Sequence, residues 1–127
     1  MRVFIDTSAL YSVLDRSDTN HAAAGSIWQR LLNTDDTLIT SNYILVEINT
    51  LIQHRLGMAA VTDLQASIVP AINLVWIDEV LYQGAVSVQL TTNHKQLSLV
   101  DCTSFEICRR MGIEHVFAFD RHFSEQN

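Results

Sequence analysis

The feature of this sequence that most constrains its fold is a regular alternation of short apolar segments with longer segments of helical periodicity. The apolar segments have the length of strands and are expected at residues 2–6, 37–41, 72–78 and 115–119. Strands separated by helices pair in parallel, and the helices then cover both faces of the sheet. We therefore expect an α/β fold, a three-layer α/β/α sandwich around a mostly parallel central sheet.

Residues that cap or end helices predict where the helical segments begin and stop. Thr7 or Ser8 can cap a helix that runs to residue 14, and Ser41 or Asn42 can cap a second helix, which Gly57 ends. Further helices are expected at residues 20–32, 58–69, 79–91 and 99–111. Because no linker, repeat or low-complexity tract interrupts the pattern, residues 1–127 are expected to form one domain.

The composition limits what the chain can bind. Charged residues make up 17% of the chain, against about 25% in typical proteins, so we expect some apolar surface to be covered by another chain. The net charge of -6 argues against binding nucleic acid through a broad basic face. No apolar run approaches the roughly 18 residues that span a bilayer, and the first residues lack the features of a signal peptide. We expect a soluble, cytoplasmic protein that does not bind membranes.

Four acidic residues from separate segments are predicted to meet at one edge of the sheet. Asp6 and Asp120 end strands, and Glu47 and Asp101 lie in early turns of helices that begin at the same edge. Two carboxylates about 4 Å apart repel by roughly 4 kcal/mol at an effective dielectric constant near 20. Such a cluster needs either raised pKa values or bound divalent cations. Taken singly, Asp120 could instead cap the following turn, and Glu47 could be a solvated helix residue.

The ligand types predict which cation would bind and what it would do. Oxygen ligands without sulfur or imidazole favour Mg²⁺ or Mn²⁺, and the histidines form no zinc motif. Such ions activate water and stabilise the charge that builds on a phosphate, so phosphodiester hydrolysis is the expected reaction. The hydroxyls of Thr7 and Ser8 follow Asp6 directly and can orient the carboxylates or a bound water, although helix capping is an alternative role for both.

Four segments that contain these acids together resemble the PIN-domain family. They are FIDTSAL at 4–10, NYILVEI at 42–48, LSLVDCTSF at 97–105 and VFAFDRHF at 116–123. The resemblance spans nearly the whole chain and implies a flavodoxin-like sandwich in which the first strand is central and the last strand lies beside it. It also implies metal-dependent cleavage of RNA. The implied metal ligands are Asp6, Glu47, Asp101 and Asp120, with Ser8 as the small polar residue of the site.

A chain of this length that contains only such a domain is similar to the VapC-like toxins of type II toxin-antitoxin systems. That similarity implies an endoribonuclease that acts as a toxin, a homodimer, and a small antitoxin protein as partner. Neither spacing nor composition shows this partnership.

Other functions that use an acid cluster on this type of sheet fit less well. A phosphatase that forms an aspartyl phosphate needs a second acid two residues after Asp6, where Ser8 stands. A phospho-accepting receiver domain needs an early pair of acids and a late Lys, and neither lies near Asp6 or Asp120. A catalytically silent PIN-fold binding module remains open, although the presence of all four acids argues against it. Asp78 also ends a predicted strand, but we interpret it as a helix cap at the sheet edge.

Overall fold

Four parallel strands form the sheet of the computed structural model, which describes residues 1–119. The strands are β1 (Arg2–Ile5), β2 (Thr37–Ser41), β3 (Asn73–Val75) and β4 (His115–Phe117). Their order across the sheet is β3-β2-β1-β4, and every pairing is parallel. The predicted α/β fold is confirmed, and the first strand lies beside the last.

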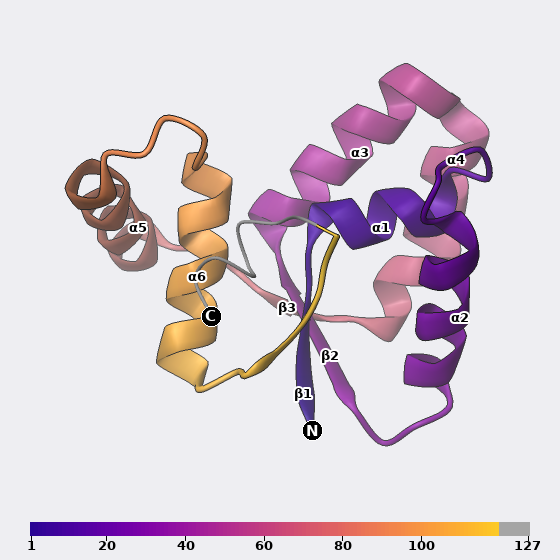
Figure 1. Cartoon of the computed structure of the whole chain (residues 1–127), viewed down its shortest axis with the longest axis horizontal. Coiled ribbons are helices and arrows are strands. Elements are labelled where there is room, and N and C mark those ends of the chain that lie inside the picture. Colours follow the sequence, from indigo (N-terminus) through magenta and orange to yellow (C-terminus); the bar gives the residue numbers. More distant parts are fainter. Residues whose placement is uncertain (120–127) are drawn as a thin grey trace.

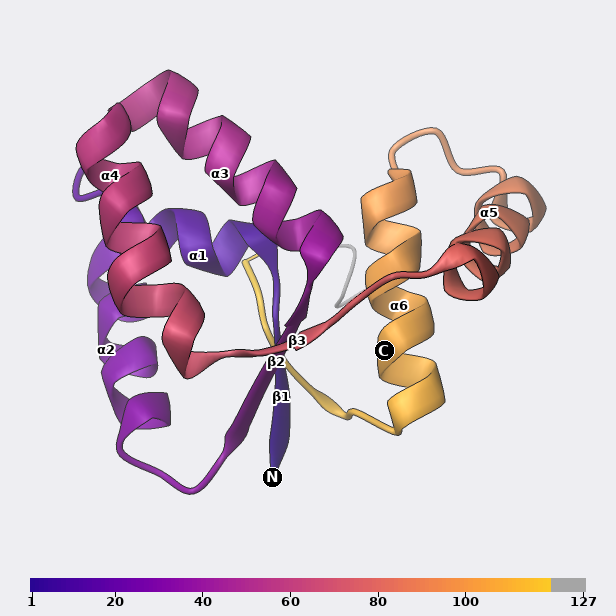
Figure 2. The same cartoon turned by 180° about the vertical axis from the view of Figure 1, so that it is seen from behind.

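Helices cover the sheet on both sides, as a parallel sheet requires (Figures 1 and 2). The helices α1 to α4 gather on one side, and α5 and α6 pack together on the other. Their bounds are α1 (Thr7–Leu14), α2 (His21–Leu32), α3 (Asn42–Leu56), α4 (Met58–Asp63), α5 (Glu79–Thr92) and α6 (Leu99–Met111). None of the helices in residues 1–119 is both long and apolar enough to cross a bilayer.

The core lies between these layers and contains most of β1. Phe4 and Ile5 are fully buried, as expected for a strand that is covered on both faces and has a neighbour on each side. On α3, the side chains of Ile44, Ile48 and Ile52 repeat every four residues and are also fully buried. This stripe fixes the rotation of α3 about its axis, and so it determines where the neighbouring Glu47 points.

Three strands are shorter than the sequence pattern predicts, because pairing ends where the partner strand ends. The predicted strand 72–78 pairs only over residues 73–75, since Val75 already lies opposite Ser41, the last residue of β2. The predicted strand 115–119 likewise stops at Phe117, which lies opposite Ile5, the last residue of β1. β1 itself ends at Ile5, one residue before the predicted end.

The helix ends mostly follow the predicted caps, with two corrections. Ser41 caps α3 through its hydroxyl, and Gly57 ends that helix with a φ of 93°. However, the first helix is capped by neither Thr7 nor Ser8, because the Asp6 carboxylate takes this position and Thr7 is already helical. The helix predicted at 58–69 also divides into α4, a π-helical turn (Leu64–Ile68) and a 3₁₀ turn (Val69–Ala71). The π-helical turn lies just ahead of Pro70, the only proline, which lies within the 3₁₀ turn and cannot donate a helical hydrogen bond.

The carboxyl ends of the inner strands and the first turns of three helices lie at one end of the molecule. In Figure 1, the upper ends of β1 and β2 lead into α1 and α3, and α6 begins at the same level. This end of the sheet is where ligands collect in open parallel α/β folds. The fold therefore places Asp6, Glu47 and Asp101 at the edge that the sequence predicts.

Candidate active site

Asp6 lies at the junction of β1, β4 and α1. Its backbone N–H donates to the carbonyl of Phe117 at 3.1 Å, which ties the end of β1 to the end of β4. Its side chain is 3% exposed, and Oδ2 accepts hydrogen bonds from the backbone N–H and the hydroxyl of Ser8, at 3.2 and 2.7 Å. A carboxylate at the first turn of a helix is stabilised by the helix dipole. Asp6 therefore caps α1 from a position at the carboxyl edge of the sheet.

Ser8 joins the two strand ends through its single hydroxyl group. The hydroxyl donates its proton to Asp6 Oδ2 and accepts a hydrogen bond from the backbone N–H of Phe119 at 2.9 Å. The ring of Phe119 packs edge-on against Phe117, with 6.0 Å between the ring centroids. Ser8 thus holds the chain one residue before Asp120. Asp120 itself lies outside the described residues, and its part in the site stays a prediction.

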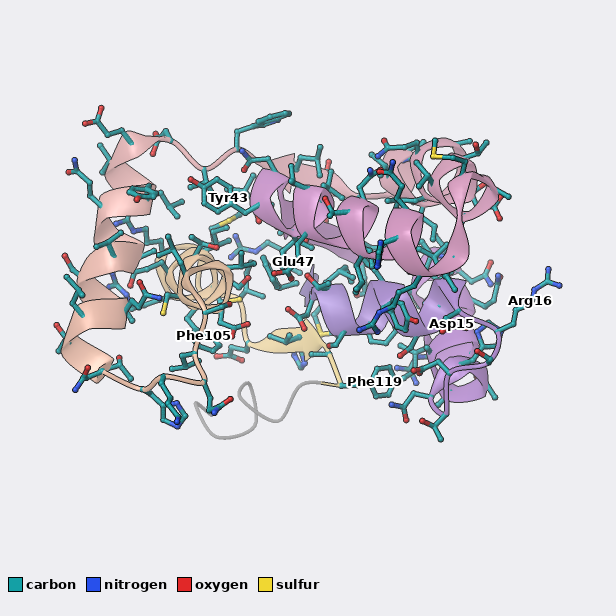
Figure 3. The ribbon with its side chains drawn as sticks, turned by 90° about the horizontal axis from the view of Figure 1, so that it is seen from above. Asp15, Arg16, Tyr43, Glu47, Phe105 and Phe119 are labelled. Atoms are coloured by element: carbon teal, nitrogen blue, oxygen red, sulfur yellow. The ribbon has the colours of Figure 1, made fainter. Side chains whose placement is uncertain are left out.

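Glu47 reaches this region from the second turn of α3. Its Oε1 accepts a hydrogen bond from the Thr7 hydroxyl at 2.5 Å, across 40 positions of the sequence. Figure 3 shows Glu47 directed from α3 into the space between α3, α1 and α6. Because Thr7 follows Asp6 directly, this bond brings the carboxylate of Glu47 to the same corner of the sheet as that of Asp6.

Asp101 occupies the first turn of α6 and is half-buried. It forms a capping box with Ser98: the backbone N–H of Ser98 donates to Asp101 Oδ2 at 3.1 Å, and the backbone N–H of Asp101 donates to the Ser98 hydroxyl oxygen at 3.0 Å. Cys108 lies seven residues later on the same helix face. Burial and then the negative charge of Asp6 raise the pKa of the Cys108 thiol to about 12.

The three described acids have compatible chemistry but do not form a closed ion cage. Among residues 1–119, no three His, Cys, Asp or Glu side chains are grouped closely enough to hold a metal ion. Asp6, Glu47 and Asp101 each accept a hydrogen bond from a neighbouring hydroxyl or amide. Their all-oxygen donor set fits a hard divalent cation, which takes carboxylate and water ligands. The three acids are thus not grouped around one ion position in the described residues, and their roles as ligands stay predictions.

A shallow depression of about 510 Å³ opens beside Glu47, and it is lined by Thr7, Val46, Glu47, Thr50 and Leu51. Val46 and Leu51 supply the apolar part of its lining, and Glu47 and the two threonines supply the polar part. Val46 is 67% exposed, so the depression offers an apolar surface directly next to the acids.

Asp78 is confirmed as a helix cap. Its Oδ1 accepts from the backbone N–H of Leu81 at 3.0 Å at the start of α5, and β3 lies at the edge of the sheet. Sequence reasoning missed two contacts at the acids. The Ser98 capping box has a local signal, since Ser stands three positions before Asp101 in the sequence. The bond from Thr7 to Glu47 has no local signal, because it depends on how α1 packs against α3.

Comparisons with known proteins agree with this fold. A family model described as PIN domain matches residues 3–127. The chain is 29% identical over 123 residues to the 23S rRNA-specific endonuclease VapC20 of Mycobacterium tuberculosis, in strain CDC 1551 / Oshkosh and in strain H37Rv alike. This match covers 96% of the chain and 92% of the relative.

A solved structure shows the same fold over almost the whole length. It is the crystal structure of Mycobacterium tuberculosis VapC20, described as a toxin that cleaves the sarcin-ricin loop. The TM-score is 0.88 at 27% sequence identity, and the match covers 98% of this chain and 95% of that one. Because the family model spans nearly every residue and the fold agrees with that of a solved relative, this chain belongs to the PIN-domain family.

Proposed function

We propose that this PIN-domain protein is a metal-dependent endoribonuclease that acts as the toxin of a toxin-antitoxin pair, with residues 1–127 as its single domain. The observation that carries the proposal is the placement of Asp6, buried where β1 meets β4 and α1, with Glu47 brought to the same corner through Thr7. The match to an rRNA-specific endonuclease over 96% of the chain supports the same reaction.

Asp6, Glu47, Asp101 and Asp120 would hold Mg²⁺ or Mn²⁺, because these ions prefer carboxylate oxygens. When bound there, such an ion would supply stabilisation of the charge on a phosphate and a more acidic water. Neighbouring hydroxyls orient two of these carboxylates. The Ser8 hydroxyl donates a hydrogen bond to one oxygen of Asp6, and the Thr7 hydroxyl donates one to an oxygen of Glu47. If Asp6 and Glu47 are ligands, these hydrogen bonds would hold both carboxylates before the substrate arrives and would lower the ordering cost of binding it.

The acidic balance of the chain limits where the RNA backbone can bind. Two divalent ions would change the net charge only from -6 to -2. Several arginines are engaged elsewhere: Arg109 and Arg110 pair with Glu106, and Arg55 stacks over the ring of Tyr11. We therefore expect weak RNA affinity without the metal ion, since bridging by the ion replaces a basic face.

Lys95 is the cation that we expect to contact the RNA backbone. It is exposed on the loop that joins α5 to α6, six residues before Asp101. Together with Asn93 and His94 it lines a shallow depression of about 210 Å³. A single cation at the start of α6 would orient a phosphate toward the acids without a broad basic surface.

The substrate and the partners follow from the relatives. VapC20 is named as specific for 23S rRNA, and we propose a structured ribosomal RNA as the substrate of this chain as well, which implies action in the cytoplasm. We also propose a homodimer and a small antitoxin protein. Support for a protein partner comes from large apolar side chains that are strongly exposed, among them Trp76, Val80 and Leu90, at 70%, 68% and 72%.

The test is expression of the wild type, of Asp6→Asn and of Asp78→Asn in cells, followed by mapping of RNA 5′ ends. Asp78→Asn is the matched control, because Asp78 also follows a strand and caps a helix, and Asn caps equally well. We expect growth arrest and new 5′-phosphate ends with the wild type and the control, and neither with Asp6→Asn. No cleavage by any of the three would favour a silent PIN-fold module, and cleavage that persists in Asp6→Asn would contradict the role proposed for Asp6.

A further inference from the structure

The hydroxyl of Thr7 contacts an acid of the candidate site rather than its own helix. Thr7 is the first residue of α1 and is 9% exposed, while Glu47 is exposed on the surface of α3. The helix cap at this position is Asp6, so helix capping does not account for the Thr7 hydroxyl. Its proton goes instead to Glu47 Oε1. A role for this hydroxyl therefore has to be sought in what it does to Glu47.

We propose that Thr7 is a positioning residue that holds the Glu47 carboxylate ready to bind the divalent cation, a role that depends on the proposed nuclease function. A glutamate on an exposed helix surface populates several rotamers, and ordering it costs conformational entropy. A hydrogen bond from a fixed donor removes part of that cost before the ion arrives. The bond uses one carboxylate oxygen, and within residues 1–119 no hydrogen bond to the second oxygen is seen.

Thr7 is well suited to act as a fixed donor. Threonine is branched at Cβ, which restricts χ1, and burial of Thr7 restricts it further. The backbone on either side is also held, because Ser8 bonds to Asp6 through both its N–H and its hydroxyl. Two consecutive residues thus serve two acids: Ser8 orients Asp6 at the end of β1, and Thr7 orients Glu47 on a different helix.

The test compares Thr7→Val with Thr7→Ser. Valine has nearly the shape of threonine without the hydroxyl, whereas serine keeps the hydroxyl. The first readout is Mn²⁺ binding to the protein without RNA, followed by the electron paramagnetic resonance signal of free Mn²⁺. We expect Thr7→Val to weaken Mn²⁺ binding by about 10-fold, the lower end of the range for residues that orient metal ligands, and Thr7→Ser to stay close to the wild type. The second readout is cleavage, which excess Mn²⁺ should restore in Thr7→Val.

A double-mutant cycle with Glu47→Ala separates positioning from a structural effect. If Thr7 acts through Glu47, Thr7→Val causes no further loss of Mn²⁺ affinity once Glu47 has been removed. An equal loss in both backgrounds would overturn the proposal, as would wild-type affinity in Thr7→Val. Failure of the proposed function looks different: the wild type itself would then neither bind Mn²⁺ nor cleave RNA, and the basis for a positioning role would be gone.

Discussion

Replacing Ser8 by alanine tests how far one hydroxyl organises the candidate site. The substitution removes the 2.7 Å bond to Asp6 and the 2.9 Å bond from the Phe119 N–H. A hydrogen bond to a charged group contributes about 1.5–3 kcal/mol and a neutral one about 0.5–1.5 kcal/mol. The backbone N–H of Ser8 still donates to Asp6, and Phe119 is exposed to water, so both contributions fall near their lower limits. We expect a loss of about 2 kcal/mol in the free energy of unfolding.

The chain provides a matched control for this substitution. Ser17 donates to Asp15 through both its N–H and its hydroxyl, at 2.9 and 2.7 Å, which repeats the geometry of Ser8 and Asp6. That pair lies in the exposed turn between α1 and α2, away from the sheet edge (Figure 3). Water replaces an exposed bond at little cost, so Ser17→Ala should change the free energy of unfolding by no more than about 0.5 kcal/mol.

Urea unfolding measures the stability that Ser8→Ala loses, and RNA cleavage measures how far the substitution disturbs the candidate site. We expect Ser8→Ala to lower the urea midpoint and to reduce cleavage by at least about 10-fold, since the carboxylate of Asp6 loses its orienting hydroxyl. Ser17→Ala should leave cleavage unchanged. If Ser8→Ala matched Ser17→Ala in both assays, the hydroxyl of Ser8 would not organise the site and the reasoning would be wrong.

Three further substitutions test the core, the charges and the substrate contact. Ile48→Ala should cost about 2–5 kcal/mol of unfolding free energy in a urea titration, because the side chain is fully buried, while Val46→Ala on the exposed face of α3 should cost little. Hydrogen bonds and charge from Arg109 and Arg110 lower the pKa of the buried Glu106. The stabilisation from this ion pair is therefore present above the unfolded pKa near 4.3 and is lost as the pH falls through the lower folded pKa. Glu106→Gln should flatten the dependence of unfolding free energy on pH in that acid range. In an Asp6→Asn background, Lys95→Gln should reduce the slope of log K for RNA against log salt by about 0.7–0.9, whereas Arg16→Gln, exposed in the turn after α1, should not.

The layer order of the fold was predictable because the apolar pattern is repeated at every strand and helix. The buried stripe of Ile44, Ile48 and Ile52 is visible in the sequence as a four-residue repeat, and the structure confirms it. The strand ends were less predictable, since the end of β3 depends on where its partner β2 stops and not on its own residues. Trp76 and Ile77 continue the apolar run of that strand, yet neither pairs with another strand within residues 1–119, and the Ile77 N–H donates to the side chain of Asn42 instead.

The edge at which the acids lie was predictable from the strands, but the contacts of the acids were not. A strand that ends at Asp6 places this residue at the carboxyl edge whatever the neighbouring side chains are. The hydrogen bond to Glu47, by contrast, depends on the packing of α1 against α3 and on the rotamer of Thr7. Whether Asp6, Glu47 and Asp101 share an ion also depends on side-chain rotation and on Asp120, and neither follows from spacing along the chain.

The central claim is that these acids converge on one hard cation, and a crystal structure of the protein grown with Mn²⁺ tests it most directly. The anomalous difference density of Mn²⁺ locates the ion independently of the refined side chains. We expect a peak at the carboxyl end of β1, with oxygens of Asp6 and at least one other of the four acids in direct coordination. A protein that cleaves RNA but shows no peak there, or a peak coordinated only by other residues, would contradict the account.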